Sequence, residues 1–363
     1  MIVEDFILKL KPYEGGKPVE ELKRELGLDG EIIKLASNEN PLGASKKAVE
    51  AIKKSAENVY LYPDGNSYYL KKKMSKKLGV GEDNIIFGNG SDELLELIYR
   101  TFATKKEDEI LYCYPTFIEY KLIGMAFNKK IKELPLKNYK YDIDALIENI
   151  NENTRIIFLN TPNNPTGTII KKGDIERVIE QSGSNCLVVI DEAYYEYAIE
   201  EDDYEELLDL YKNNNIIILR TFSKAYGLAG LRIGYGIAQS DIVGFLNRTR
   251  PPFNVNLLAQ EAAIAALDDE EHIKKSVELN SEGKEFLYYE FNKMGIDYVK
   301  TYSNFILFDV KKDANDVYEE LLKKGVIVRS MAGYGYKTSL RVTIGTLKEN
   351  EIFINSLKEV LGV

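Results

Sequence analysis

The sequence is poor in the residues that many hydrolytic and metal-dependent sites need. It has one histidine, His272, and two cysteines, Cys113 and Cys186, in 363 residues. His272 lies in the highly charged segment DDEEHIKKSVE, which predicts a solvated helix face and a surface histidine without a role. On that prediction a Ser-His-Asp triad, a Cys-His pair and a histidine-ligated metal site are excluded, and we expect no metal. Catalysis would then use lysine, tyrosine, aspartate, glutamate or a cofactor.

Disulfides, membrane spans and basic surface are also not expected. The two cysteines are far apart and form no Cys-x-x-Cys pair, which fits a reducing cytoplasm. No apolar stretch reaches the roughly 20 residues of a membrane helix, and the first residues carry acidic side chains, unlike a signal peptide. The 58 acidic against 48 basic residues give a net charge of -10, which argues against general binding to nucleic acid or anionic lipid. We expect a cytoplasmic protein with small-molecule partners.

Short apolar segments alternate with stretches of helical periodicity over the first two thirds of the chain. At ~100–200 residues per domain, the length predicts about two domains. Short buried strands that alternate with helices predict an α/β fold with a mostly parallel central sheet. The strand candidates are residues 84–87, 109–112, 155–160, 186–190 and 216–220.

After about residue 245 the pattern changes to that of a smaller α+β domain. A long helical region at 256–294 precedes strand candidates at 301–310, 325–330 and 339–345, with helices at 314–324 and at the end. We expect three parts: an N-terminal arm, residues 1–40, with a short helix at 19–26, that joins the small domain; a large domain, residues 41–245; and a small C-terminal domain, residues 246–363.

Residues 221–234, TFSKAYGLAGLRIG, directly follow an apolar strand. Ligands collect at the carboxyl ends of parallel strands, where Ser223 and Lys224 would lie. A partly desolvated lysine has a lowered pKa and can form a Schiff base, and Arg232 could hold a phosphate beside it. A surface lysine on a turn is an equally good interpretation of this segment alone.

Two further segments predict ligand contacts. An apolar strand runs into Asp191, with Tyr194 three residues later. A buried carboxylate needs a positive partner, such as a protonated pyridine nitrogen or an arginine, although Asp191 could simply cap a helix. Gly90 and Ser91 open an amphipathic helix whose N–H groups and dipole can bind phosphate, but they also suit an ordinary first turn.

A proline-rich loop and two arginines complete the candidate residues. The loop LNTPNNPTG would hold the Asn164 amide in a fixed orientation, although on its own it is only a turn. Arg329 and Arg341 lie on adjacent strand candidates and could clamp a carboxylate or phosphate, or be ordinary exposed arginines.

The order of these motifs resembles the fold-type I pyridoxal-phosphate aminotransferases. The motifs run LASNENPLG, YPDG, NGSDE, YPTF, NTPNNPTG, DEAY, TFSKAYGLAGLRIG, SNF, VRSMAGYGY and LRVTIGT, and they span about residues 10–345. Within that class the sequence is most similar to the histidinol-phosphate aminotransferase family. The resemblance implies pyridoxal 5'-phosphate as the cofactor, bound by the large domain.

The resemblance also implies roles for the matching residues. Lys224 would bind the cofactor as a Schiff base and serve as the base, and Asp191 would pair with the pyridinium nitrogen. The implied cofactor contacts are Gly90, Ser91, Asp92 through its backbone, Phe117 stacked on the ring, Asn164 and Tyr194 at the ring's 3'-oxygen, Asp191, Ser223, Lys224, Arg232 and Tyr62. Tyr62, in the YPDG motif, would reach the phosphate of the neighbouring subunit, which implies an obligate homodimer with shared active sites.

For the substrate, the resemblance implies contacts from Tyr13, Asn40, Asn164, Arg329 and Arg341. The arginine pair would take the substrate's phosphate in one half-reaction and the carboxylates of glutamate in the other. The implied reaction converts L-histidinol phosphate and 2-oxoglutarate to imidazole-acetol phosphate and glutamate, in histidine biosynthesis. Relatives frequently have arginine immediately before the YPDG motif, where this sequence has Leu61, so the resemblance implies no arginine contact from that loop.

Three alternatives remain open. An aromatic amino-acid aminotransferase would use the same arginine pair for a carboxylate. A threonine-phosphate decarboxylase would also take a phosphorylated substrate but would remove its carboxylate; the SNENPLG spelling, with Glu39, and the MAGYGY loop are more similar to the aminotransferase. A non-enzymatic regulator could retain the fold, but it would be free to lose Lys224, which is present.

Overall fold

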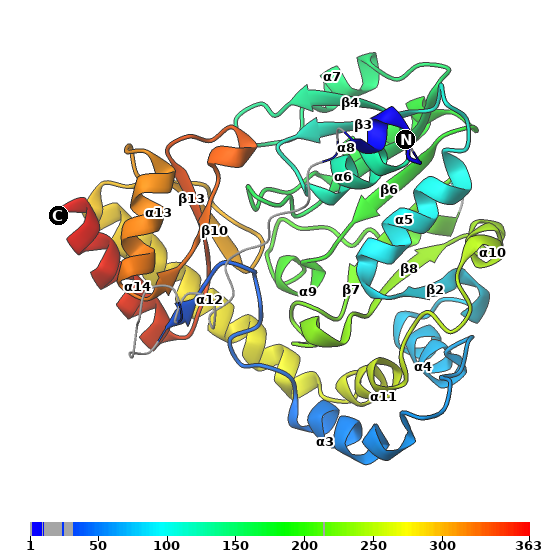
Figure 1. Ribbon diagram of the computed structural model, residues 1–363, viewed down its shortest axis with the longest axis horizontal. Helices are drawn as coiled ribbons and strands as arrows, with labels where there is room; N and C mark the ends of the chain where they lie inside the picture. Colours follow the sequence, from blue (N-terminus) through cyan, green and yellow to red (C-terminus); the bar gives the residue numbers. More distant parts are fainter. Residues whose placement is uncertain (1, 9, 11–23, 25–31, 213–214) are drawn as a thin grey trace.

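The computed structural model describes residues 2–8, 10, 24, 32–212 and 215–363. Figure 1 shows a large part built on a central sheet and a smaller part that contains the C-terminus. The predicted helix at 19–26 and the candidate residue Tyr13 lie outside the described residues, apart from Arg24.

The large part is organised around a seven-stranded sheet with the order β2-β8-β7-β6-β5-β3-β4. Neighbouring strands from β7 to β4 are parallel, whereas β8 is antiparallel to both β7 and β2. The strands are β2 (Ile85–Gly88), β3 (Glu109–Tyr114), β4 (Lys130–Pro135), β5 (Thr154–Asn160), β6 (Leu187–Asp191), β7 (Ile216–Thr221) and β8 (Gly234–Ala238). The prediction of a mostly parallel central sheet is confirmed.

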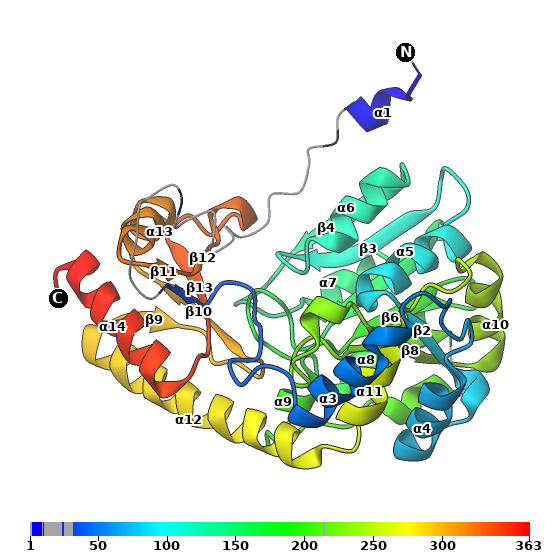
Figure 2. The ribbon, with the colours of Figure 1, turned by 60° about the horizontal axis from the view of Figure 1, so that its bottom comes forward.

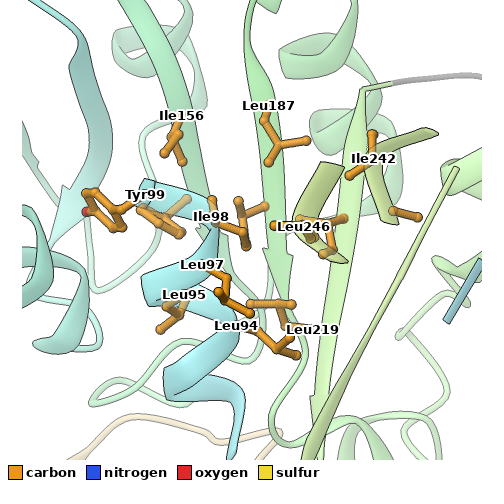
Figure 3. Packing of buried hydrophobic residues seen from close by; sticks show 14 of the residues in the cluster. Leu94, Leu95, Leu97, Ile98, Tyr99, Ile156, Leu187, Leu219, Ile242 and Leu246 are labelled. Carbon is orange, nitrogen blue, oxygen red and sulfur yellow. The ribbon is translucent and has the colours of Figure 1, made fainter. Parts of the chain in front are cut away.

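Helices bury both faces of this sheet because alternate residues of the strands are apolar on both sides. In β6, Leu187 and Val189 pack on one face, and Val188 and Ile190 pack on the other. The first face is covered by α5 (Gly90–Phe102), α6 (Glu119–Ala126) and α10 (Ser240–Thr249), and the second by α7 (Ile143–Glu148) and α8 (Lys172–Ser182). Figure 3 shows the leucine-rich side of α5 against β5, β6 and β7.

A third group of helices packs at the end of the sheet formed by β2 and β8. It contains α3 (Lys46–Ser55), α4 (Tyr68–Leu78) and α11 (Leu257–Ala266), which share one apolar cluster with those strands. Short helical segments elsewhere are α1 (Asp5–Leu8), η1 (Ala56–Asn58), η2 (Glu82–Asn84), α9 (Tyr195–Ala198), η3 (Leu208–Lys212), η4 (Ala229–Leu231) and η5 (Ala332–Tyr334).

The smaller part has a four-stranded antiparallel sheet with the order β12-β13-β10-β9, and a parallel pair, β1-β11. These strands are β1 (Ile33–Lys34), β9 (Asp297–Tyr298), β10 (Phe305–Asp309), β11 (Val326–Ile327), β12 (Arg329–Ser330) and β13 (Ser339–Thr343). The helices α12 (Glu270–Met294), α13 (Ala314–Lys323) and α14 (Leu347–Leu361) enclose its core. The prediction of a smaller α+β domain is thus confirmed.

The structure refines several sequence predictions in this region. The helical region at 256–294 is two helices, α11 and α12, with a turn between them. In both views the long helix α12, drawn in yellow, runs from the smaller part to α11 on the large part (Figures 1 and 2). The predicted boundary at 245/246 falls inside α10, and the division into three parts stays a prediction.

His272 corrects one prediction, because it is not a fully exposed surface residue. It lies half-buried in the first turn of α12, and its burial lowers the pKa of the imidazole.

Among the described residues, no cluster of three or more histidine, cysteine or acidic side chains is placed to hold a metal ion. No helix in the described part of the chain is both long enough and apolar enough to cross a membrane.

Candidate active site

A cavity of about 220 Å³ lies at the carboxyl edge of the central sheet. The last residues of β5, β6 and β7, which are Asn160, Asp191 and Thr221, line it because parallel strands end at the same edge. The smaller part closes it with residues of β12, η5 and β13. The cavity is therefore built by both parts of the molecule.

Most residues singled out in the sequence meet at this cavity. Those that line it are Ser91, Asp92, Phe117, Asn164, Asp191, Tyr194, Ser223, Lys224, Arg232, Arg329 and Arg341. Gly90 lies directly under the guanidinium of Arg232. Asn40 and Tyr62 do not line the cavity, and Tyr13 is outside the described residues.

Lys224 follows β7 on a turn that points its amine into the cavity. Its Nζ donates to the backbone oxygen of Ser37 at 3.3 Å and lies 5.6 Å from the centre of the Tyr194 ring. Burial and the positive charge of Arg341 lower the pKa of Lys224 to about 8. A lysine with that pKa keeps an appreciable neutral fraction near neutral pH, so it can act as a nucleophile or a base.

Asp191 is a buried carboxylate whose positive partner is missing among the described side chains. It accepts hydrogen bonds from the Tyr120 hydroxyl at 2.6 Å and from the backbone N–H of Ala193 at 3.2 Å. Burial raises its pKa to about 6, although the Tyr120 hydrogen bond acts in the opposite direction. A cationic nitrogen in the cavity would supply the missing partner.

The N-terminus of α5 forms an anion cradle that depends on two glycines. The N-cap residue Asn89 makes no side-chain capping bond, so the first N–H groups of α5 have no side-chain acceptor there. A Cβ on Gly90, which has φ +79°, would lie 2.6 Å from Nη2 of Arg232. A Cβ on Gly234 would lie 2.5 Å from the backbone nitrogen of Ser91. Helix N–H groups and a guanidinium at close range are suited to a phosphate.

Asn164 and Tyr194 present polar groups on the side of the cavity that faces the smaller part. Arg341 donates through Nη1 to Oδ1 of Asn164 at 2.5 Å and through Nη2 to the backbone oxygen of Ala36 at 2.6 Å. Since the Asn164 oxygen accepts from Arg341, its NH₂ group is oriented elsewhere. Burial raises the pKa of Tyr194 to about 12, so its hydroxyl is a donor at neutral pH.

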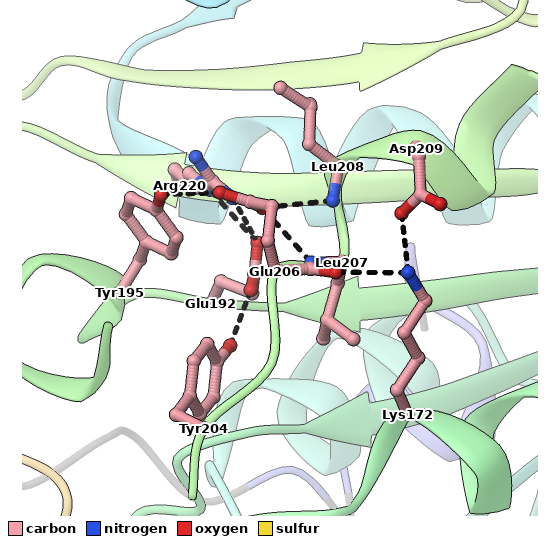
Figure 4. A network of polar contacts seen from close by, with 9 residues as sticks. All are labelled: Lys172, Glu192, Tyr195, Tyr204, Glu206, Leu207, Leu208, Asp209 and Arg220. Atoms are coloured by element: carbon pink, nitrogen blue, oxygen red, sulfur yellow. Dashed lines mark hydrogen bonds and ion pairs between the residues drawn. The ribbon is translucent and has the colours of Figure 1, made fainter. Parts of the chain in front are cut away.

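A network of ion pairs and hydrogen bonds joins Glu192, directly after β6, to Arg220 in β7 (Figure 4). Arg220, in β7, donates to Glu192 at 2.9 Å and to Glu206 at 2.9 Å, and its guanidinium lies 3.3 Å from the centre of the Tyr195 ring. The side chains of Arg220 and Glu192 are 1% and 0% exposed. Because Glu192 directly follows Asp191, this pair ties the end of β6 to β7.

Sequence reasoning missed several residues at or behind the cavity. The cavity is also lined by Ser37, Asn38, Asn160, Thr221 and Tyr334. Tyr120 does not line it but donates a hydrogen bond to Asp191. Signals for some were present, since Asn38 lies in SNENPLG and Tyr334 in MAGYGY. Asn40, the residue predicted from the first of these motifs, does not line the cavity, and its Nδ2 donates to the backbone oxygen of Ala225 and to Ser276, each at 2.8 Å.

The chain is similar in sequence and in fold to known aminotransferases. The family described as "Aminotransferase class I and II" matches residues 30–357. The chain is 49% identical to the histidinol-phosphate aminotransferase of Moorella thermoacetica over 98% of this chain and 92% of that protein. It is 45% identical to the protein of that name from Bacillus subtilis strain 168, over 99% and 100% of the two chains. The crystal structure of histidinol-phosphate aminotransferase from Sinorhizobium meliloti, in complex with pyridoxal-5'-phosphate, superposes with a TM-score of 0.90 at 25% identity, covering 99% and 98% of the two chains.

Proposed function

Because the chain belongs to the aminotransferase class I and II family, we propose that it transfers the amino group of L-histidinol phosphate to 2-oxoglutarate, in histidine biosynthesis. The observation that carries this proposal is the meeting, in one cavity, of the Lys224 amine, the unpaired carboxylate of Asp191 and the anion cradle at α5. Near-full-length similarity to histidinol-phosphate aminotransferases supports the choice of substrate.

The cavity suits pyridoxal 5'-phosphate as the cofactor. The cradle of Ser91, Ser223 and Arg232 would hold its phosphate, and the buried carboxylate of Asp191 would pair with its ring nitrogen. Asn164 and Tyr194 would donate to its ring oxygen, and Phe117 would pack against the ring. When bound, the cofactor supplies an aldehyde for covalent attachment and a ring that withdraws electrons from the substrate's Cα.

Lys224 performs the proton transfers in this proposal. Its neutral Nζ would take the proton from Cα of the substrate, and the resulting ammonium group would deliver it to the carbon that the cofactor's aldehyde contributes. A pKa of about 8 lets the same amine act in both directions near neutral pH. The turn after β7 and the contact with Ser37 keep the amine inside the cavity. A base that is already held next to the substrate reacts faster than one that must be encountered in solution.

Arg329 and Arg341 are the proposed anion-binding residues for the two substrates. Arg341 is buried and oriented by Ala36 and Asn164, whereas Arg329 is partly buried on the neighbouring strand, directly opposite it in the register. Guanidinium groups bind both phosphate and carboxylate through paired hydrogen bonds, so one pair can serve histidinol phosphate and 2-oxoglutarate in turn. Substrate contacts of Tyr13 and Asn40 stay predictions.

We also propose that the protein works as a homodimer in which Tyr62 reaches the partner's cavity. Tyr62 is 82% exposed and stacks on Phe253 with ring centres 4.9 Å apart. The segments that carry these rings expose further large hydrophobic side chains. Together we call Val59, Tyr60, Leu61, Tyr62, Tyr68, Tyr69 and Phe253 the aromatic surface. Surfaces of this kind are typical of protein–protein contacts.

We also propose a cytoplasmic location, because the buried thiols of Cys113 and Cys186 form no disulfide.

A panel of amino donors tests the proposed function. Histidinol phosphate, tyrosine, phenylalanine and threonine phosphate are each incubated with the holoenzyme and 2-oxoglutarate, and glutamate and carbon dioxide are measured separately. We expect the highest kcat/KM for histidinol phosphate and no carbon dioxide. Higher kcat/KM for tyrosine or phenylalanine would make the protein an aromatic aminotransferase. Carbon dioxide from threonine phosphate would make it a decarboxylase, and no reaction with any donor would leave a non-enzymatic role.

A further inference from the structure

Asn38 is a buried polar residue at the cavity to which the sequence analysis gave no role. It is 1% exposed and has φ +55°, in the left-handed region of backbone space. Asparagine and aspartate are among the few side chains that adopt this conformation readily. Its chain neighbours Ala36 and Ser37 also line the cavity.

Four hydrogen bonds fix the orientation of the Asn38 side chain and backbone. The backbone N–H donates to Oγ1 of Thr343 at 2.9 Å, and Oγ1 donates back to Oδ1 of Asn38 at 3.2 Å. The backbone oxygen accepts from Nδ2 of Asn304 at 3.1 Å. Nδ2 of Asn38 donates to the hydroxyl oxygen of Tyr194 at 2.9 Å. Because the Thr343 hydroxyl directs its hydrogen to Oδ1, the amide nitrogen is the end that faces Tyr194.

These contacts join the two parts of the molecule. Thr343 ends β13, and Asn304 immediately precedes β10, so both belong to the smaller part. Tyr194 follows β6 in the large part and lines the cavity with Lys224. Asn38 is thus hydrogen-bonded both to the sheet of the smaller part and to the hydroxyl of Tyr194 in the large part.

The direction of the last hydrogen bond has a chemical consequence. A phenol has one hydrogen to donate and lone pairs that accept. Since Asn38 donates to the Tyr194 oxygen, the Tyr194 O–H hydrogen is not used in that contact. It stays available for an acceptor in the cavity.

We propose that Asn38 is a positioning residue that holds the Tyr194 hydroxyl as a hydrogen-bond donor toward the ring oxygen of the cofactor. This inference rests on the proposed function, because the acceptor belongs to pyridoxal 5'-phosphate. Asn38 itself acts only through Tyr194.

The substitution Asn38→Asp tests the direction of the hydrogen bond with little change of shape. Aspartate accepts the left-handed backbone, but at pH 8 its carboxylate has no hydrogen to donate, so the Tyr194 O–H turns toward it. Apo-protein is titrated with pyridoxal 5'-phosphate, and binding is followed by absorbance. We expect the dissociation constant to rise about tenfold. The pH midpoint of the bound cofactor's absorbance should move to higher pH, because a donor at the ring oxygen favours the more negative form.

Tyr194→Phe separates positioning from a general structural effect. In that background Asn38→Asp should change neither the dissociation constant nor the pH midpoint, since the hydroxyl it acts through is gone. An equal fold-change in both backgrounds would overturn the inference, as would no change in either. Asn128→Asp is the matched control, because Asn128 is exposed and has φ +53°. It should leave both quantities unchanged.

A second variant keeps the test available if Asn38→Asp does not fold. Thr343→Val removes the hydroxyl that anchors Oδ1 of Asn38, so the amide can rotate away from Tyr194. We expect a smaller rise in the dissociation constant that again requires the Tyr194 hydroxyl, and a rise independent of it would overturn the inference. If the unmodified protein itself neither binds the cofactor nor produces glutamate, the proposed function fails instead.

Discussion

At the scale of single residues, the chemistry depends on how burial changes two ordinary side chains. Burial lowers the pKa of Lys224 to about 8 and raises that of Asp191 to about 6. Both shifts reflect the cost of a charge in a poorly solvated site. The lysine can therefore lose its proton near neutral pH, while the carboxylate is still largely ionised and able to pair with a cation.

The shifted pKa of Lys224 predicts a pH dependence for attachment of the cofactor. Only the neutral amine attacks an aldehyde, so the association rate of pyridoxal 5'-phosphate with apo-protein should rise with pH and reach half its maximum near pH 8. Stopped-flow absorbance between pH 6 and 10.5 measures this rate. In Arg341→Met the midpoint should move to higher pH, because a nearby positive charge is removed. A midpoint at pH ~10.4, the pKa of an ordinary lysine, would contradict the conclusion that the reacting amine is the buried Lys224.

Sequence patterns identified the residues with chemistry of their own but not those that support them. Lys224, Asp191 and Arg232 stand at strand ends or glycine-rich turns, where a local pattern has meaning. Tyr120 and Asn38 act through hydrogen bonds to residues 71 and 156 positions away in the chain. Such long-range pairings follow from the packed fold. The motif that contains Asn38 therefore does not reveal its partner Tyr194, and Tyr120 lies in none of the motifs.

At the scale of helices and strands, the approach of β8 to the first turn of α5 shapes the anion cradle. Gly234→Ala would place a Cβ 2.5 Å from the Ser91 nitrogen, so the strand and the helix must separate. We expect the dissociation constant of pyridoxal 5'-phosphate to rise about tenfold or more, because charge-assisted hydrogen bonds are lost. Gly230→Ala is the control, since a Cβ there meets nothing within 4 Å. Equal affinities for the two variants, measured by absorbance titration, would refute the role given to this contact.

The ion pair between β6 and β7 predicts a large effect on stability. Arg220→Met removes the partner of Glu192, whose side chain is 0% exposed, and leaves an unpaired acid in the interior. The expected loss is about 3–5 kcal/mol in the free energy of unfolding, measured by urea denaturation. Arg177→Met removes an exposed guanidinium that pairs with Asp144 and Asp174 and should unfold at the same urea concentration as the unmodified protein. The prediction fails if the two variants behave alike.

Two strands of the central sheet were not predicted, for different physical reasons. The edge strand β4 has the sequence KIKELP, in which charged side chains interrupt the apolar pattern. The strand β8, GYGIA, is rich in glycine, which lowers strand propensity but here permits close approach to β2 and α5. The apolar strands β3, β5, β6 and β7 were predicted because they are buried on both faces.

At the scale of the whole molecule, the aromatic surface should form the contact between two subunits. Leu61→Asp puts a charge on this surface directly beside Tyr62 and should give monomers with weaker cofactor binding, because Tyr62 could no longer reach the partner's cavity. Sedimentation velocity measures the mass of the unmodified protein, which we expect to be a dimer, and of the variant. Tyr289→Asp is the control, because Tyr289 is 61% exposed on α12 and lies outside the aromatic surface. A monomeric unmodified protein with full activity would contradict the shared site.

The attachment of the cofactor to Lys224 is the claim from which the rest of the account follows. The most direct measurement is to load the protein with pyridoxal 5'-phosphate, trap the covalent link with borohydride, and map the labelled peptide by mass spectrometry. We predict a phosphopyridoxyl group on Lys224 and on no other lysine, and no label in Lys224→Ala. A label on a different lysine, or an unlabelled Lys224 in protein that produces glutamate, would contradict the account.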